Sequence, residues 1–141
     1  EIFKELNLTE DSVMYDLGCG DGRVLFYCEE RSLKVKCIGI DKALAARVVF
    51  VFKKIFFHKK SNVVFCHKNM FKHDLSDATH IFVYLFPGLM NSLFDKLKKE
   101  LKPGAIVISC DFEFKDKKPS RIVNLNRSKH LLGQRLLIYE F

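Results

Sequence analysis

The chain has 141 residues, with 24 basic against 17 acidic side chains and a formal net charge of +7. A hydrophobic fraction of 48% beside 29% charged residues is typical of a globular domain and excludes disorder as the main state. We expect a single domain over residues 1–141, because a chain of this length can bury a sizeable core.

Targeting and metal signals are weak in this sequence. No apolar run is long enough for a transmembrane helix, and no signal-peptide pattern opens the chain. It starts at Glu1 rather than Met, which suggests a removed N-terminal piece. The five cysteines contain no C-x-x-C pair, and the five histidines lack metal-ligand spacing. We therefore predict no metal site, and a reducing, cytoplasmic setting.

Short apolar runs alternate with helical patterns along the chain. A short helix is expected over 1–8, and longer helices over about 21–31, 43–57 and 89–101. The second of these longer helices is rich in β-branched and aromatic residues, but fifteen residues without a turn signal favour a helix. Pro87-Gly88 is expected to separate a strand from the third helix. Strands are predicted at 13–17, 35–40, 62–66, 80–86, 105–110, 121–125 and 135–141.

This order predicts a doubly wound α/β fold. Strands that are almost wholly apolar and alternate with helices form a parallel sheet covered on both faces. No convincing helical pattern lies between the last two predicted strands, so they are expected to form an antiparallel hairpin at one edge.

The most informative segment is the run D-L-G-C-G-D-G-R from Asp16 to Arg23, where the first strand gives way to a helix. Glycine lets the backbone approach a ligand closely, and ligands of open α/β sheets bind at the carboxyl ends of strands. Asp41 ends the second strand, 21 residues after Gly20, where a carboxylate can accept the hydroxyls of a ribose. The pattern therefore predicts a nucleoside-binding site.

The glycine spacing argues against a dinucleotide. Position 23, where G-x-G-x-x-G needs its third glycine, is Arg23. Asp16 would also repel a pyrophosphate, whereas it suits a ligand that carries an ammonium group.

On these motifs the chain resembles the class I S-adenosylmethionine-dependent methyltransferases over essentially its whole length. The resemblance implies a mostly parallel, seven-stranded, Rossmann-like sheet and S-adenosylmethionine as the cofactor. It places the methionine moiety at Asp16, Gly18 and Gly20 and the ribose at Asp41, with Cys19 and Lys42 also in the cofactor site. Asn69 stands where this family often has an acid facing the adenine amino group, and Met70 would pack on the adenine.

Further runs, K-N-M-F-K, Y-L-F-P and L-K-P-G-A-I-V-I-S, are similar to those of a narrower group. This group contains the lysine methyltransferases of the ATP synthase c-subunit and of the adenine nucleotide translocase, with their prokaryotic relatives. The resemblance implies methyl transfer to a protein lysine, with Tyr84, Phe86 and Pro87 at the acceptor site.

Three alternatives remain open at this point. The positive charge also suits methylation of RNA or of a small molecule, although the basic residues are scattered. A catalytically inactive basic binding module of the same fold is the alternative outside enzymes. Tyr84 and Phe86 could instead be core residues of a buried strand. The sequence predicts no oligomeric state.

Overall fold

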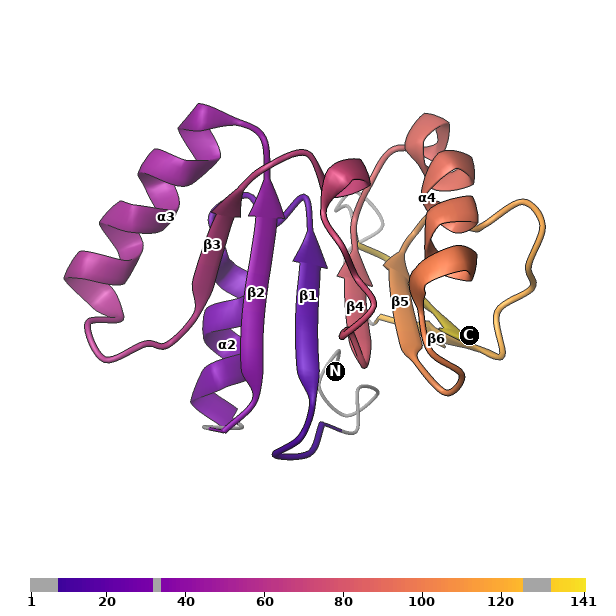
Figure 1. The fold of residues 1–141 in the computed structure, drawn as a ribbon, viewed down its shortest axis with the longest axis horizontal. Helices are drawn as coiled ribbons and strands as arrows, with labels where there is room; N and C mark the ends of the chain where they lie inside the picture. The colour runs from indigo at the N-terminus through magenta and orange to yellow at the C-terminus, as the bar shows by residue number, and fades with distance from the viewer. Residues whose placement is uncertain (1–7, 32–33, 126–132) are drawn as a thin grey trace.

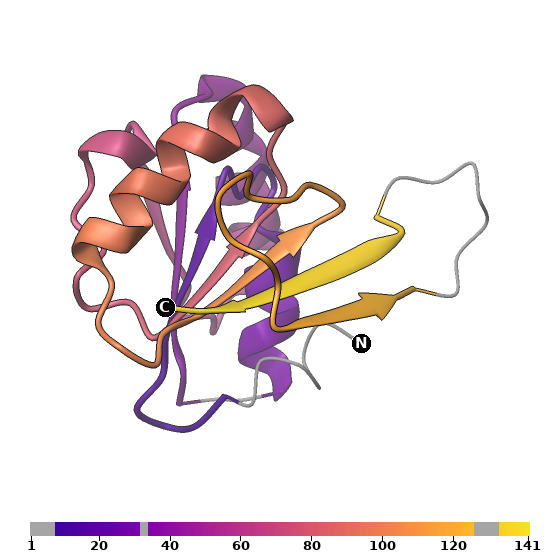
Figure 2. The same ribbon diagram turned by 90° about the vertical axis from the view of Figure 1, so that its right-hand side faces the viewer.

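The computed structural model of the protein describes residues 8–31, 34–125 and 133–141, so the helix predicted over 1–8 lies outside them except for its last residue. Seven strands form one sheet in the order β3-β2-β1-β4-β5-β7-β6, as Figures 1 and 2 show. The strands are β1 (Val13–Leu17), β2 (Lys36–Asp41), β3 (Val64–His67), β4 (His80–Val83), β5 (Ile106–Cys110), β6 (Arg121–Asn124) and β7 (Arg135–Glu140).

The sheet is parallel through β1–β5 and antiparallel at β7. This confirms the predicted fold class, including the reversed C-terminal pair. The strand β7 lies between β5 and β6 rather than beyond β6, and it pairs antiparallel with both. The apolar run 136–139 explains this placement, because a central strand must be buried on both faces.

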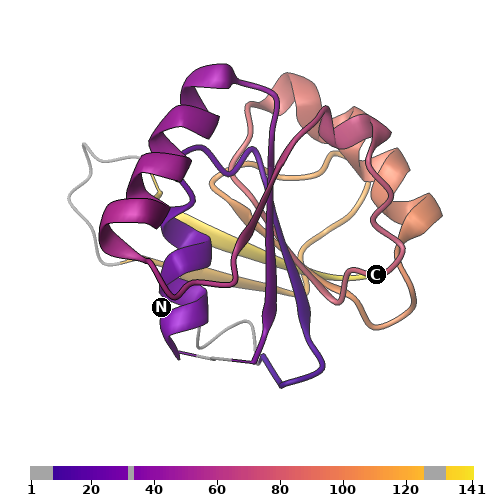
Figure 3. The same ribbon diagram turned by 60° about the vertical axis from the view of Figure 1, so that its left-hand side comes forward.

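Helices cover both faces of the sheet: α2 (Arg23–Arg31) and α3 (Leu44–Phe57) on one, α4 (Pro87–Glu100) on the other (Figure 2). Successive side chains of β1 point to opposite faces of the sheet and so belong to two separate core clusters. Met14 packs in the cluster that contains Phe26 and Phe50, whereas Tyr15 packs in the cluster with Leu93. Figure 3 shows α3 along the outer edge of the molecule, beside β3.

The boundary between β4 and α4 differs from the prediction. The strand ends at Val83, and α4 begins at Pro87 instead of being separated from the strand by it. Proline suits the first turn of a helix, since its missing N–H is not needed there and its φ is already helical. Residues 84–86 are therefore a connection with two exposed rings, not the end of a buried strand.

The chain order of the strands reverses between β1 and β4. The connections from β1 lead outward through β2 to β3, while β4 and β5 extend in the other direction. Such a switch point leaves a crevice at the carboxyl ends of the two central strands, which is where open α/β sheets bind ligands. Among the described residues, no helix is both long and apolar enough to cross a membrane.

Candidate active site

The glycine loop after β1 is fastened to the end of β2. The amides of Gly18 and Cys19 both donate to the carbonyl of Ile40, at 2.8 and 3.2 Å. The Gly20 amide donates to Asp41 Oδ2 at 3.0 Å, and Ala43 donates to Asp41 Oδ1 at 2.8 Å. The Asp41 carboxylate therefore has a fixed orientation at the rim of the crevice. Each of its oxygens keeps a lone pair that can accept a ribose hydroxyl.

Three glycines of this loop have φ between +53° and +80°, but their surroundings differ. A Cβ on Gly18 would lie 2.9 Å from Leu85, and one on Gly22 would overlap the ring of Phe50. A Cβ on Gly20 would meet nothing within 4 Å. Gly18 and Gly22 are thus constrained by packing. The space beside Gly20 is open, as a site for close approach of a ligand requires.

A cavity of about 300 Å³ lies at this edge of the sheet, near the lower end of the range for small-molecule sites. It brings together the following residues that the sequence singled out: Gly18, Asp41, Lys42, Asn69, Met70, Tyr84 and Phe86. It also contains residues that the sequence interpretation missed: Ile40, Lys68, Phe71, Leu85 and Leu89. All five are close in sequence to predicted ones, so extending each motif by its flanking residues would have found most of them.

The structure places Asp16 at the end of β1, directly before the glycine loop, with 3% of its surface exposed. Burial, together with the negative charges of Asp41 and Asp21, raises the pKa of Asp16 to about 8. The carboxyl group is therefore largely protonated at neutral pH. An ammonium group brought close to it would favour its ionised form.

Asp21 differs from Asp16 because its charge is neutralised. It forms ion pairs with Arg23 at 2.9 Å and with Lys53 at 2.5 Å, and these hold the pKa of its carboxyl group well below the usual range. The second of these pairs links the glycine loop to α3.

Three predicted cofactor residues, Asp16, Cys19 and Gly20, are not among the residues that line the cavity, and a fourth, Asn69, lines it but also has a structural role. The Cys19 side chain is buried next to Gly39 and Leu25, and it is not among the residues that line the cavity. Burial and nearby Asp16 raise the pKa of its thiol, so it is not a nucleophile. Asn69 lines the cavity, but its Oδ1 already accepts the Phe71 amide at 3.0 Å, where it caps a short 3₁₀ helix, η1 (Met70–Lys72). It retains one acceptor lone pair for a ligand.

An aromatic cluster forms one wall of the cavity mouth. Phe86 is 79% exposed and Tyr84 is 38% exposed, so neither is a core residue. The ring centroid of Tyr84 lies 6.3 Å from that of Phe112, and the centroid of Phe86 lies 6.4 Å from it. Phe112 was not predicted. Because the carboxyl ends of paired parallel strands share an edge, the residues after β5 could have been expected there.

Pro87, the third predicted acceptor-site residue, does not line the cavity but begins α4 directly after Phe86. Its fixed φ determines where the aromatic connection joins the helix. Its role is to position Phe86.

The fold and site together define a class I methyltransferase: a switch-point crevice, a glycine loop, and a carboxylate at the end of β2. A family model described as "ANTKMT methyltransferase domain" matches residues 16–121, which is most of the chain. The chain belongs to this family. The match confirms the predicted enzyme class, a methyltransferase with S-adenosylmethionine as its cofactor.

Three relatives illustrate the similarity. A protein-lysine N-methyltransferase of Saccharolobus islandicus is 30% identical over 132 residues, covering 88% of this chain and 80% of that protein. The mouse adenine nucleotide translocase lysine N-methyltransferase is 28% identical over 118 residues, or 78% of this chain and 48% of that protein. The Caenorhabditis elegans lysine N-methyltransferase of the ATP synthase c-subunit is 26% identical, covering 75% and 54%. The chain thus spans about half the length of the two animal proteins.

A solved structure agrees with this placement. An RNA methyltransferase from Salinibacter ruber, in complex with S-adenosyl-L-homocysteine, superposes with a TM-score of 0.87 at 26% identity. The similarity covers 99% of this chain and 86% of that one.

The residues of this chain fit the cofactor. Asp41 provides acceptors for a ribose, and the open side of Gly20 provides space for close approach. Apolar side chains of Ile40, Met70 and Leu85 line the same cavity and suit a flat base. Among the described residues there is no group of histidine, cysteine or acidic side chains that could hold a metal ion.

Proposed function

We propose that this chain transfers the methyl group of S-adenosylmethionine to the side-chain amine of a protein lysine. The observation that carries the proposal is the aromatic mouth of the cofactor cavity, formed by the exposed rings of Tyr84 and Phe86. Aromatic faces attract cationic groups, including an incoming ammonium and a sulfonium. The three relatives described above are all named as lysine methyltransferases, which supports the same acceptor.

The protein contributes orientation more than acid–base chemistry to this reaction. When bound, S-adenosylmethionine supplies a methyl group that its sulfonium sulfur has already activated. Asp41 and the glycine loop would hold the nucleoside and methionine ends, which fixes the direction in which the methyl group points. Tyr84 and Phe86 would direct the lysine amine onto that line, so that attack is in line with the departing sulfur.

The electron balance of the transfer is simple. The lone pair of the lysine nitrogen forms the new N–C bond, the sulfur keeps the electrons of the broken S–C bond, and a proton leaves to solvent. The amine must be neutral before it attacks, and its reference pKa is about 10.4. The single-turnover rate should therefore rise from neutral pH towards about pH 9.

RNA is the second candidate acceptor. The Salinibacter ruber neighbour is named as an RNA methyltransferase, and the chain carries a net charge of +7. A lysine acceptor is preferred because the three relatives are all named as lysine methyltransferases, and the S. islandicus protein among them is more similar in sequence than the RNA methyltransferase.

Labelled cofactor distinguishes the two acceptors. Purified protein is incubated with methyl-labelled S-adenosylmethionine and cell extract, and the products are treated with nuclease or with protease. We expect protease to release the label and nuclease to leave it in place. Label released by nuclease alone would replace the lysine acceptor by RNA.

A further inference from the structure

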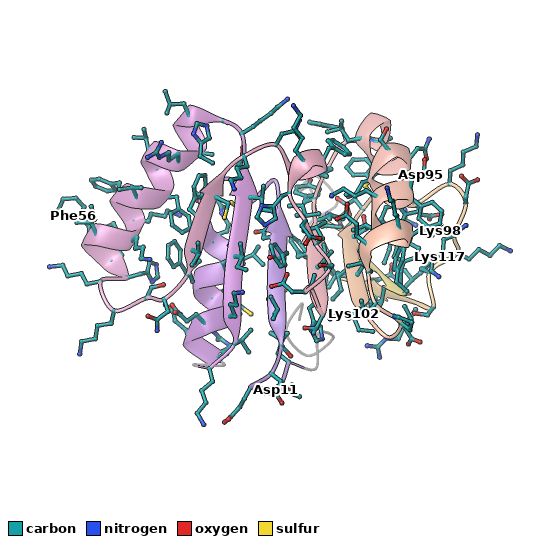
Figure 4. All side chains as sticks on the ribbon, viewed as in Figure 1. Asp11, Phe56, Asp95, Lys98, Lys102 and Lys117 are labelled. Carbon is teal, nitrogen blue, oxygen red and sulfur yellow. The ribbon has the colours of Figure 1, made fainter. Side chains whose placement is uncertain are left out.

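Helix α3 has an unusual distribution of side chains. Its outward face carries a continuous apolar stripe at helical spacing: Leu44, Val48, Phe52, Ile55 and Phe56 are between 53% and 64% exposed. Val49, Val51 and Phe57 widen this stripe. Figure 4 shows Phe56 pointing away from the protein at the outer edge of the molecule.

The two lysines of α3 point the other way, whereas Arg47 is exposed. Lys53 reaches inward to Asp21 at 2.5 Å, and Lys54 donates to the Val63 carbonyl at 2.7 Å. Phe50 is the buried anchor of the helix, stacked on Phe26 with ring centroids 4.9 Å apart. A surface helix in water has its charges outside and its apolar stripe inside. On α3 an apolar stripe faces solvent in addition to the buried Phe50. An exposed apolar patch of this kind marks a site of interaction with a membrane or another protein.

The charge around α3 indicates what covers it. The sequence from 42 to 73 contains no aspartate or glutamate, and it contains eight basic residues: Lys42, Arg47, Lys53, Lys54, Lys59, Lys60, Lys68 and Lys72. Lys59 and Lys60 follow shortly after the helix, are exposed, and have no ion pair with another described residue. Two acidic side chains lie at that end: Glu29 accepts a hydrogen bond from the Asn62 amide, and Glu30 lies 3.5 Å from His58.

We infer that α3 is a membrane-docking surface: its apolar stripe inserts into the interface of a bilayer with anionic headgroups, and Lys59 and Lys60 contact the lipid phosphates. A helix that lies in the interface plane immerses its apolar face by roughly 5–10 Å, a depth that aromatic side chains such as Phe52 and Phe56 reach. Lysines at its end then lie level with the headgroups, where they are attracted by the negative surface potential.

A second copy of the chain fits this face less well. Each chain carries +7, so two copies repel each other. A helix of 14 residues is about 21 Å long, which is a short strip for a stable dimer interface. A fluid bilayer requires no complementary shape and provides the opposite charge.

Sedimentation with lipid vesicles tests the inference on the whole chain. The probes are vesicles of phosphatidylcholine alone and of phosphatidylcholine mixed with phosphatidylglycerol. We expect the protein to sediment with the mixed vesicles and much less with the neutral ones. The double variant Phe52→Ser/Phe56→Ser should reduce binding at least about tenfold, because two large apolar side chains no longer leave water. Lys59→Glu/Lys60→Glu should reduce it roughly tenfold or more.

Matched controls come from other surfaces of the same chain. Ile122 is 47% exposed on β6, so Ile122→Ser removes a comparable apolar side chain away from α3. Lys98 and Lys99 form a pair in the last turn of α4, and Figure 4 shows Lys98 on the side of the molecule opposite Phe56. Neither Ile122→Ser nor Lys98→Glu/Lys99→Glu should change vesicle binding. Melting temperatures and cofactor binding of all variants establish that they are folded.

Four outcomes would overturn the inference. In the first the protein stays in the supernatant with mixed vesicles, and in the second the α3 variants and the controls sediment alike. Equal binding to neutral and mixed vesicles would remove the role assigned to the lysines. A dimer in light scattering that Phe52→Ser/Phe56→Ser dissociates, without vesicle binding, would make a second copy the occupant. None of these results depends on methyl transfer, so they stand apart from the test of the proposed function.

Discussion

Gly20 and Asp41, 21 residues apart in sequence, are joined by a hydrogen bond of 3.0 Å from the glycine amide to Oδ2 of the carboxylate. The bond connects the loop after β1 with the end of β2 and holds the carboxylate at the cavity. Two motifs that the sequence identified separately thus form one unit. A change at Asp41 is therefore expected to affect both the ribose contact and the loop.

Replacing Asp41 tests the ribose contact. Asp41→Ala should weaken S-adenosylmethionine binding by about 10–150-fold, because a hydrogen bond to a charged group contributes roughly 1.5–3 kcal/mol. Asp41→Asn keeps one acceptor oxygen and should lose less. Calorimetric titration measures both affinities, and an unchanged Kd in Asp41→Ala would remove this residue from the cofactor site.

Two glycines of the same loop offer a matched comparison. Gly20→Ala places a methyl group in open space beside the cavity, so it should mainly impair cofactor binding. Gly22→Ala directs its methyl group into Phe50 and should mainly lower the melting temperature. Both positions have a φ in the left-handed region, so an alanine at either one also costs about 1–2 kcal/mol of stability. The interpretation fails if Gly20→Ala binds the cofactor as tightly as the unchanged protein.

Much of this arrangement could be predicted from the sequence. The glycine run and Asp41 sit at the ends of apolar strands, and the geometry of a parallel sheet then brings them together. Insertion of β7 between β5 and β6 could not be predicted, because strand order depends on pairing energies over the whole sheet. The exposure of Tyr84 and Phe86 was also undetermined, since their apolar residue types suit a buried strand equally well. In the structure Pro87 lies in the first turn of α4, so the strand ends before Tyr84. In the sequence alone, a proline at this position is compatible with either interpretation.

The buried Asp16 predicts a pH effect on stability. Its folded pKa, about 8, lies above the ordinary value of 3.8, so it favours the folded state most below pH 4. This contribution is lost as pH rises towards 8. Relative to Asp16→Asn, the free energy of unfolding of the cofactor-free protein should fall by roughly 2–5 kcal/mol over that range.

Denaturant titrations of both proteins at several pH values measure this difference. Comparing the two proteins cancels the contributions of other groups, such as His73, whose pKa is lowered by burial. A constant difference between pH 4 and pH 8 would show that the Asp16 carboxyl group ionises without penalty.

Replacing Phe86 distinguishes a role at the acceptor site from a role in the core. Because the side chain is largely exposed, Phe86→Ala should change the free energy of unfolding by no more than about 0.5 kcal/mol. It should slow single-turnover transfer more than it weakens cofactor binding. Ile122→Ala, at an exposed position on β6, is the control. A lower melting temperature with unchanged turnover would instead make Phe86 a structural residue.

Identification of the methylated residue is the sharpest test of methyl transfer to a protein lysine. Protein labelled in extract by methyl-labelled S-adenosylmethionine is hydrolysed completely with acid, and the labelled amino acid is identified by mass spectrometry. We expect ε-N-methyllysine, in amounts that fall with Asp41→Ala and with Phe86→Ala. Label in any other amino acid, or no labelled protein at all while the cofactor is bound, would contradict it.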